Sequence, residues 1–314
     1  MMPGLDARIT RADPQYDASM SLRCTALIAV PALVLAALAG CSEKTGSATD
    51  GTSAGSPDAS SSGAAGSCTP ADLPLKKAGR LTVATDSPAY DPWFSDDDPS
   101  NGKGFESAVA YAVAKQLGFS KDQVDWVKQS FNTSYTPGEK SFDFDINQIS
   151  ITPERAKQVD FSTGYYTAAQ AVITLKKDAA KATSLEDLKG LKLGAQTATT
   201  SLTAIRDDVK PRQQPLVFDN TNQAKQALLN GQVDAIVADL PTAFYVTAAE
   251  ISGSTITGQF AASGAPEEFG MLMQKGSGLK PCLDQAVKSL EDDGTLAAIE
   301  KKWLSDVVDV PVLK

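Results

Sequence analysis

An α/β fold with parallel sheets is predicted by two features of the sequence. Short runs rich in apolar and β-branched residues alternate with segments whose apolar residues recur at helical spacing. Aspartates directly follow two of these runs, Asp86 after Leu81–Thr85 and Asp239 after Val233–Ala238. Because ligands of such sheets bind beyond the carboxyl ends of strands, both aspartates are candidates for a binding site.

The first half of the alternating region opens with the strand expected at Leu81–Thr85, followed by a turn-rich stretch over 87–104. A helix is expected next, because apolar residues recur at helical spacing from Phe105 to Leu117 and Gly118 supplies a stop. Three further elements are expected: an extended segment over 140–150, a short helical piece from Pro153 and a strand over 170–175.

A second unit of alternating strands and helices starts near Ser184. One strand is expected over 191–195 and another over 233–238. After the first of them, Thr199, Thr200 and Ser201 are N-cap candidates for a helix. The remaining elements are a helix that ends at Gly231, an extended segment near 269–273 and two closing helices on either side of Gly294.

Length and composition are those of a soluble globular protein with room for two lobes, at 314 residues, 42% hydrophobic and 21% charged. The formal net charge of −9 argues against nucleic acid and against an anionic lipid surface as partners. The sequence contains no histidine, which removes the commonest general base and the commonest metal ligand. We therefore expect no metal, no cofactor and no enzyme activity, although carboxylate or lysine catalysis stays open.

A signal peptide is predicted at residues 1–40. Residues 24–38 are apolar and follow Arg23, but they are too few for a membrane span, which needs about 20 residues. They are typical of the apolar part of a signal peptide. Translation is expected to start at Met20, because residues 1–19 carry three aspartates where a signal peptide needs positive charge.

A lipid anchor is predicted directly after the apolar segment. Residues 38–41 (LAGC) resemble the bacterial lipobox, in which the cysteine, here Cys41, is diacylated; the alternative is a buried helix with an incidental cysteine. The remainder of 41–67 is rich in Gly, Ser, Ala and Thr and is expected to be a flexible tether with a reach of about 25–30 Å. These features predict a protein anchored at the outer face of the cytoplasmic membrane.

The four cysteines have different expected fates. Cys24 is removed with the signal peptide and Cys41 carries the lipid, which leaves Cys68 and Cys282. An even pair of cysteines in an oxidising compartment predicts a disulfide between Cys68 and Cys282.

Residues 148–162 (QISITPERAKQVDFS) are similar to the signature of family 3 extracellular solute-binding proteins, the polar amino-acid receptors of ABC importers. Five more segments agree with this family in order: Thr82–Asp86, Gly104–Glu106, Ser184–Gly190, Gly231–Asp239, and Asp293–Thr295 continuing to Trp303. The resemblance covers roughly residues 79–306. Each segment alone is a weak signal, whereas six segments in order make a specific one.

The resemblance implies a two-lobe periplasmic-binding fold of type II, with the ligand in a cleft between the lobes. The chain is expected to cross between the lobes near 168–172 and again near 267–271. Lobe 1 then comprises residues 68–170 and 268–314, and lobe 2 comprises residues 171–267.

Two charged residues are implied to bind the main chain of the ligand. Arg155 matches the family arginine that clamps the ligand carboxylate, a role that suits a guanidinium because its fork binds a carboxylate through two hydrogen bonds. Asp239 matches the aspartate that receives the ligand ammonium. The alternatives are a surface arginine paired with Glu154 or Asp160, and a turn aspartate before Pro241.

Hydroxyl groups are implied to complete the carboxylate site. Ser150 matches a position whose hydroxyl and amide meet the carboxylate. Thr199 and Thr200 match a pair at a helix start, where the N–H groups and the helix dipole favour an anion. Taken alone, the run Thr-Thr-Ser at 199–201 is more often only an N-cap. The glycine that usually precedes this pair is replaced by Ala198.

Aromatic and polar residues are implied to surround the rest of the ligand. Tyr90 matches the aromatic residue that stacks on the ligand, and Trp93 stands where phenylalanine is common, with core packing as the alternative for both. Asp86 matches a residue at the pocket edge. Gln148 and Gln196 are expected to bind the ligand through their side-chain amides, and the neighbouring Asn147 is a further polar residue of the expected pocket. A polar amino acid is therefore favoured as the ligand. Whether Asn147 and Gln148 face it stays open.

The function expected from these features is the capture of a polar amino acid by a monomeric, lipid-anchored protein and its delivery to the permease of an ABC importer. The alternative is a lyase of the cyclohexadienyl dehydratase type on the same fold. Such a lyase needs a proton-transfer group in the cleft, for which Asp91 and Glu106 are candidates. A third alternative, the ligand-sensing module of a receptor, needs a transmembrane helix and a signalling domain after the binding unit.

Overall fold

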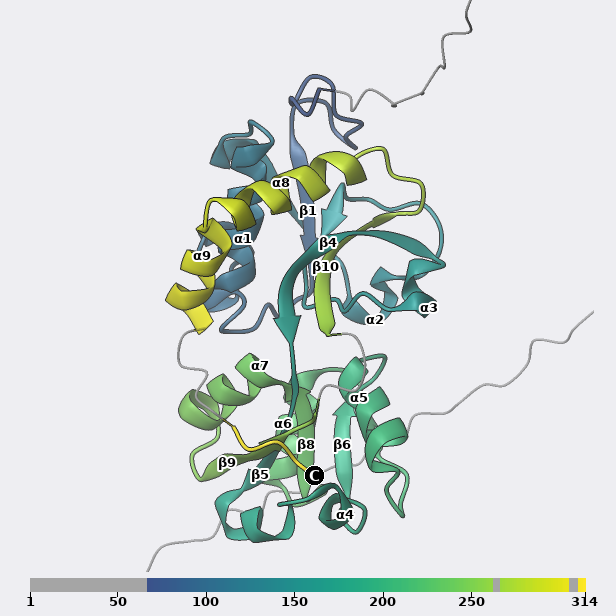
Figure 1. The fold of residues 1–314 in the computed structure, drawn as a ribbon, viewed down its shortest axis with the longest axis vertical. Helices are drawn as coiled ribbons and strands as arrows, with labels where there is room; N and C mark the ends of the chain where they lie inside the picture. The colour runs from purple at the N-terminus through teal and green to yellow at the C-terminus, as the bar shows by residue number, and fades with distance from the viewer. Residues whose placement is uncertain (1–66, 262–265, 305–309) are drawn as a thin grey trace, which may run out of the picture. The chain divides into compact units, whose positions relative to one another are not determined.

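The computed structural model describes residues 67–261, 266–304 and 310–314, which contain two five-stranded sheets (Figure 1). The first sheet has the strand order β2-β1-β3-β10-β4 and the second has the order β7-β6-β8-β5-β9. The strands of the first sheet are β1 (Leu81–Thr85), β2 (Val124–Lys128), β3 (Phe144–Asp145), β4 (Val159–Ala168) and β10 (Glu267–Gln274). Those of the second sheet are β5 (Gln170–Leu175), β6 (Leu193–Gln196), β7 (Leu216–Phe218), β8 (Ala235–Asp239) and β9 (Ser254–Gln259).

Each sheet mixes parallel and antiparallel pairs. β1 is parallel to β2 and β3, and β6 is parallel to β7 and β8. β10 is antiparallel to β3 and β4, and β5 is antiparallel to β8 and β9. The prediction of parallel sheets is therefore correct for only part of each sheet, because the chain leaves the first sheet along β4, enters the second along β5 and returns along β10.

The longer helices lie where the apolar periodicity predicts them. α1 (Phe105–Gln116) follows Gly104, whose φ is 93° and where an added Cβ would lie 2.4 Å from the carbonyl oxygen of Trp93, so a side chain would be strained there. α8 (Lys280–Asp292) and α9 (Thr295–Leu304) flank Gly294 as expected. The shorter helices are α2 (Phe131–Ser134), α3 (Pro153–Ala156), α4 (Leu185–Leu188), α5 (Thr200–Ala204), α6 (Thr221–Leu229) and α7 (Leu240–Tyr245).

Single turns complete the helical structure. π-helical turns at Ile205–Val209 and Val246–Glu250 extend α5 and α7, respectively. Turns of 3-10 helix occur at Ser95–Asp97, Pro99–Asn101, Lys121–Gln123 and Lys176–Lys181.

Each sheet has its own hydrophobic core. In the first, Phe105 of α1, Leu283 of α8 and Phe269 of β10 are fully buried in one cluster. In the second, Ile173 of β5 and Ile236 of β8 are buried together. Separate cores on separate sheets are what the predicted two-lobe architecture requires.

The two crossings between the sheets fall close to the expected positions. β4 ends at Ala168 and β5 begins at Gln170, so one residue separates the sheets, and Figure 1 shows this direct passage. On the return, Glu267 already pairs with Ala168 in the first sheet. The expected boundaries assigned Gln170 to lobe 1 and Glu267 to lobe 2. The structure instead places Gln170 in β5 of the second sheet and Glu267 in β10 of the first.

Residues 310–314 lie against the second sheet, which corrects their assignment to lobe 1 within 268–314. Val312 forms a parallel bridge with Gln259 at the end of β9, and the Leu313 N–H donates to the Gln259 carbonyl at 2.9 Å. The Leu313 side chain is buried, with only 2% exposed. Helical periodicity ends near Trp303, and Val312 and Leu313 cover a strand edge that would otherwise be unpaired.

The predicted disulfide is present. The Cys68 and Cys282 sulfur atoms are 2.04 Å apart, and the bond joins the start of the described chain to α8. The predicted signal peptide at 1–40, the lipidated Cys41 and all but the last residue of the 41–67 tether lie outside the described residues. Within the described ranges, no helix has the length and apolar character needed to cross a membrane.

Candidate functional site

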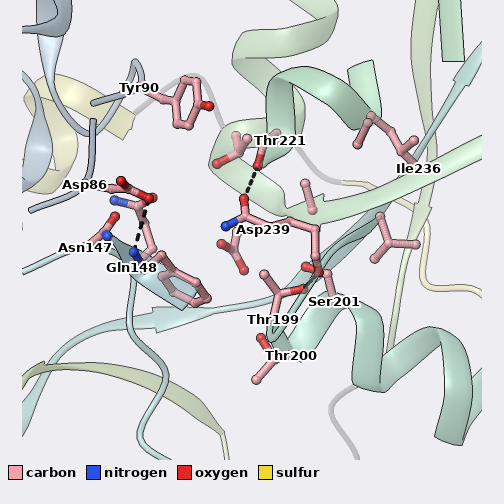
Figure 2. A pocket seen from close by; sticks show the side chains of 16 residues that line it. Asp86, Tyr90, Asn147, Gln148, Thr199, Thr200, Ser201, Thr221, Ile236 and Asp239 are labelled. Atoms are coloured by element: carbon pink, nitrogen blue, oxygen red, sulfur yellow. Dashed lines mark hydrogen bonds between the residues drawn. The ribbon is translucent and has the colours of Figure 1, made fainter. Parts of the chain in front are cut away.

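A pocket is lined by residues from both sheets and their connections. The lining residues form two groups, one from each lobe, and Figure 2 shows the labelled residues of one group across the pocket from those of the other. The first group is Asp86, Tyr90, Phe131, Asn147 and Gln148. The second group is Gln196, Thr199, Thr200, Ser201, Thr221, Ala224, Ile236, Val237, Ala238, Asp239 and Thr242. Seven of the ten ligand-binding residues expected from the sequence are among them.

Asp86 follows β1 directly and is fixed by two main-chain donors. Its carboxylate accepts hydrogen bonds from the N–H of Ser87 at 2.7 Å and from the N–H of Phe131 at 3.2 Å. The ring of Tyr90 lies 5.3 Å from the Lys225 ammonium, which itself forms an ion pair with Glu250 at 2.6 Å. This end of the pocket therefore offers a carboxylate and an aromatic ring.

Gln148 lines the pocket in a left-handed backbone conformation with φ of 46°. Glu106, which is completely buried, holds it there by accepting hydrogen bonds from its main-chain N–H at 2.6 Å and from its side-chain amide. The hydroxyl of Tyr165 donates to the same carboxylate. Burial raises the pKa of Glu106 to about 7.

On the opposite wall, β6 ends at Gln196 and leads to the threonine pair. The Thr199 hydroxyl accepts from the N–H of Leu202 at 3.1 Å, so Thr199 is the N-cap of α5 and also lines the pocket. The Gln196 side-chain carbonyl accepts from the Thr221 hydroxyl at 2.9 Å. The N-cap alternative is therefore correct for Thr199, in addition to its place in the pocket.

Asp239 ends β8 and lines the same wall. The Gln170 amide donates to its carboxylate at 2.6 Å. The residue as a whole is partly exposed, but its carboxyl group is enclosed, and this burial together with the nearby Glu267 carboxylate raises the pKa of Asp239 to about 8. An ammonium group placed beside Asp239 would favour its charged form.

The raised pKa of Asp239 predicts how the stability of the ligand-free protein depends on pH. Because the folded-state pKa lies above the ordinary 3.8, the folded state binds more protons, so stability falls as the pH rises from about 4 to about 8. Asp239→Asn is expected to remove one group's share of this slope, at most about 1.4 kcal/mol per pH unit. Urea unfolding at pH 5 and pH 8 measures it.

The slope is expected to decrease rather than vanish in this variant. Glu106 and Asp145 are also buried acids with a pKa raised to about 7, so they contribute with the same sign. An Asp239→Asn slope equal to that of wild type would contradict the assigned environment of this carboxyl group. Asp292→Asn, at an exposed ion pair with Lys288, is the matched control.

Arg155 and Ser150 do not line the pocket in this structure. The Arg155 guanidinium is buried, donates to the carbonyls of Ser150 at 2.8 Å and Ala198 at 2.9 Å, and lies 5.0 Å from the ring centre of Tyr135. It therefore joins residues from both lobes. The alternative of a surface arginine paired with Glu154 or Asp160 is wrong, because the side chain is buried.

Trp93 is a core residue, which corrects its assignment to the ligand site. It is fully buried, and its ring centre lies 5.8 Å from that of Phe105 and 5.7 Å from those of Tyr166 and Phe269. Its indole N–H donates to the Thr242 hydroxyl at 2.8 Å. Trp93 thus reaches the pocket only through Thr242.

A cluster of polar residues that was not expected from the sequence lies where the crossings meet. The Glu267 carboxylate accepts from the hydroxyls of Ser150 and Thr200, each at 2.6 Å, and from the Gln170 amide at 3.1 Å. The Ser201 hydroxyl in turn donates to the Gln170 carbonyl oxygen. The sequence did contain a signal for this cluster. Gln170 and Glu267 are polar residues at the two expected crossings between the lobes, where a side chain is enclosed and needs a hydrogen-bonding partner.

Neither residue nominated for a lyase lines the pocket. Glu106 is enclosed beneath Gln148, and Asp91 accepts hydrogen bonds from Ser95 at 2.9 Å and Tyr245 at 3.3 Å. In the part of the chain that the structure describes, no three Cys, Asp or Glu side chains gather in a way that could hold a metal ion.

Comparison with known proteins finds relatives along most of the chain. The model of the family described as bacterial extracellular solute-binding proteins, family 3, matches residues 81–306. The L-cystine-binding protein TcyA of Bacillus subtilis (strain 168) is 31% identical over 238 residues, which cover 74% of this chain and 84% of that protein. The ABC transporter glutamine-binding protein GlnH of the same strain is 31% identical over 215 residues, covering 67% and 76%.

A solved structure shares the fold. The ancestral amino acid-binding protein AncCDT-1, a precursor of cyclohexadienyl dehydratase, matches with a TM-score of 0.61 at 32% identity, covering 72% of this chain and 95% of that chain. The type II periplasmic-binding fold expected from the sequence is therefore confirmed. The chain belongs to the bacterial extracellular solute-binding proteins, family 3.

Proposed function

We propose that this protein captures a free L-α-amino acid outside the cytoplasm and delivers it to the permease of an ABC importer. The observation that carries the proposal is the pocket between two walls, with Asp239 on one wall and Asp86 on the other. An aspartate whose charged form is unfavourable without a cation suits the ammonium group of an amino acid. The cystine- and glutamine-binding relatives support the same ligand class.

The lining of the pocket favours a polar ligand side chain. Amide or hydroxyl groups of Asn147, Gln148, Gln196 and Thr221 lie around it, together with the Asp86 carboxylate. When a ligand displaces water from the pocket, each of these polar groups needs a hydrogen-bonding partner on the ligand, because a buried polar group without a partner costs free energy. Apolar amino acids would leave several of them without a partner.

The cellular setting of the proposal combines the family with the chain's first segments. The protein acts outside the cytoplasm, because its family is extracellular. We propose further that Cys41 carries a lipid that holds a monomeric protein at the outer face of the cytoplasmic membrane, with 42–67 as the tether. No catalytic step is proposed, since neither Asp91 nor Glu106 lines the pocket.

A thermal-shift panel of the common L-amino acids and L-cystine tests the function. A ligand at about 100 times its dissociation constant is expected to stabilise the protein by about 2.7 kcal/mol, so at least one polar member should raise the unfolding temperature by several degrees. Recovery of that amino acid unchanged after incubation separates binding from turnover. If no member raises the unfolding temperature, or the recovered compound is altered, the proposal is wrong.

A further inference from the structure

The side chain of Glu267 occupies a site built for a carboxylate. Its Oε1 atom accepts from two hydroxyls at 2.6 Å, those of Ser150 and Thr200, and its Oε2 atom accepts from the Gln170 amide at 3.1 Å. Ser150 comes from the first lobe and Thr200 from the start of α5 in the second. The carboxylate therefore gathers donors from both lobes at the point where the chain crosses between them.

The same two hydroxyls belong to the segments that the family resemblance assigns to the ligand carboxylate. Burial lowers the pKa of Arg155, the third member of that assignment, and the negative charge of the nearby Glu267 opposes this shift. A guanidinium carries five N–H donors, and the Arg155 hydrogen bonds to the Ser150 and Ala198 carbonyls use two of them. Donors of Arg155 therefore remain for an incoming carboxylate, whereas the hydroxyl protons are already engaged.

A hydroxyl group has only one proton to donate. Ser150 and Thr200 cannot donate to Glu267 and to a ligand carboxylate at the same time. A ligand carboxylate that takes these donors has to displace Glu267 from them. Resting on the amino-acid-binding function proposed above, we infer that Glu267 is an internal carboxylate that holds this subsite in the ligand-free protein and competes with the ligand's α-carboxylate.

This competition makes Glu267 a determinant of both affinity and specificity. A ligand without a carboxylate gains little by displacing Glu267, because it offers no anion for Arg155. A ligand with one gains the guanidinium as well as the hydroxyls, since charge-assisted hydrogen bonds are the stronger kind. The Glu267 carboxylate thus lowers the affinity for every ligand that must displace it, and it favours ligands that carry a carboxylate of their own.

Two other roles for Glu267 give different results. If Glu267 helps Asp239 to hold the ligand ammonium, its removal weakens binding. If it only ties the lobes together, its removal changes the affinity for every ligand by the same factor. The distinguishing quantity is the ratio of affinities for an amino acid and for its α-carboxamide, which keeps the ammonium and the side chain but has no carboxylate.

The test is calorimetric titration of wild type and Glu267→Ala with two probe pairs, L-glutamine with L-glutaminamide and L-arginine with L-argininamide. Glu267→Ala is expected to raise the preference for the acid over the carboxamide by about tenfold, a change of about 1.4 kcal/mol. Effects of the variant on Asp239 or on lobe closure act on both members of a pair and cancel in the ratio. Unfolding temperatures confirm that each variant is folded.

Two further variants separate occupancy from charge. Glu267→Gln removes the charge but keeps an oxygen acceptor for Ser150 and Thr200, so its gain in preference should be clearly smaller than that of Glu267→Ala. Glu268→Ala removes the exposed neighbouring carboxylate and should leave the ratio within about twofold of wild type. An equal gain in Glu267→Gln and Glu267→Ala would attribute the effect to charge alone and overturn the inference.

The remaining outcomes are also decisive. An unchanged or lowered ratio in Glu267→Ala, with the acid still bound by wild type, overturns the inference but leaves the proposed function intact. If neither glutamine nor arginine binds either protein, the comparison is repeated with the amino acid that gives the largest shift in the panel and its carboxamide. Absence of binding across the whole panel, in wild type and Glu267→Ala alike, overturns the proposed function itself.

Discussion

Arg155→Ala is expected to weaken amino-acid binding by about 30-fold to several thousand-fold. Loss of one partner of a desolvated charge pair costs about 2–5 kcal/mol. Arg155 is buried beside the rings of Phe131 and Tyr135, and it donates to the Ser150 and Ala198 carbonyls of the two lobes. Its loss therefore removes the partner that we propose for the ligand carboxylate, together with two hydrogen bonds that join the lobes.

Calorimetric titration with the best amino acid from the panel measures this effect. Arg155→Lys keeps the charge without the planar fork and should fall between wild type and Arg155→Ala. Arg80→Ala, which removes an arginine from a half-exposed pair with Asp125, is the matched control and should bind within twofold of wild type. Binding by Arg155→Ala within threefold of wild type would refute the assigned role.

Replacing Cys68 and Cys282 by serine is expected to lower the free energy of unfolding by up to about 5 kcal/mol. The bond closes a loop with a sequence separation of 214 residues, and constraint of the unfolded chain grows with loop length. It also joins the first described residues to α8, which packs on the first sheet. Denaturant unfolding of the oxidised wild type and of the double variant measures the difference.

Affinity should change little in the double variant, because neither cysteine lines the pocket. Reduced wild type should match the double variant in stability, which separates loss of the bond from the effect of the substitutions. A loss of stability below about 0.5 kcal/mol, with intact-mass analysis showing the bond in wild type, would contradict the expectation.

The fold was predictable where local periodicity and turn residues agree. The helix after Gly104 and the two helices around Gly294 follow from apolar spacing and glycine positions alone. Residues 310–314 were not predictable, because their burial depends on an edge strand more than fifty residues earlier. The antiparallel pairing of β5 with β8 and of β10 with β4 likewise depends on where the chain crosses between the sheets and not on the sequence of either strand.

The residues of the candidate site likewise fall into those that local sequence reveals and those whose place depends on the three-dimensional fold. Asp86 and Asp239 were identified because they follow apolar strands, a pattern that local sequence reveals. Trp93 was misassigned because a large aromatic residue near a pocket and one beneath it have the same sequence pattern. Glu267 was missed because its partners, Ser150, Gln170 and Thr200, meet only in three dimensions.

The attachment of residues 310–314 to the second sheet has a practical consequence. Cys68 is bonded to α8 in the first lobe, whereas the carbonyl of Lys314 accepts from the N–H of Leu185 in the second at 3.1 Å. The two ends of the folded unit thus belong to different lobes. A donor dye before Cys68 and an acceptor dye after Lys314 would be carried by different lobes, so energy transfer between them would report any change in the distance between the lobes without a label inside the pocket.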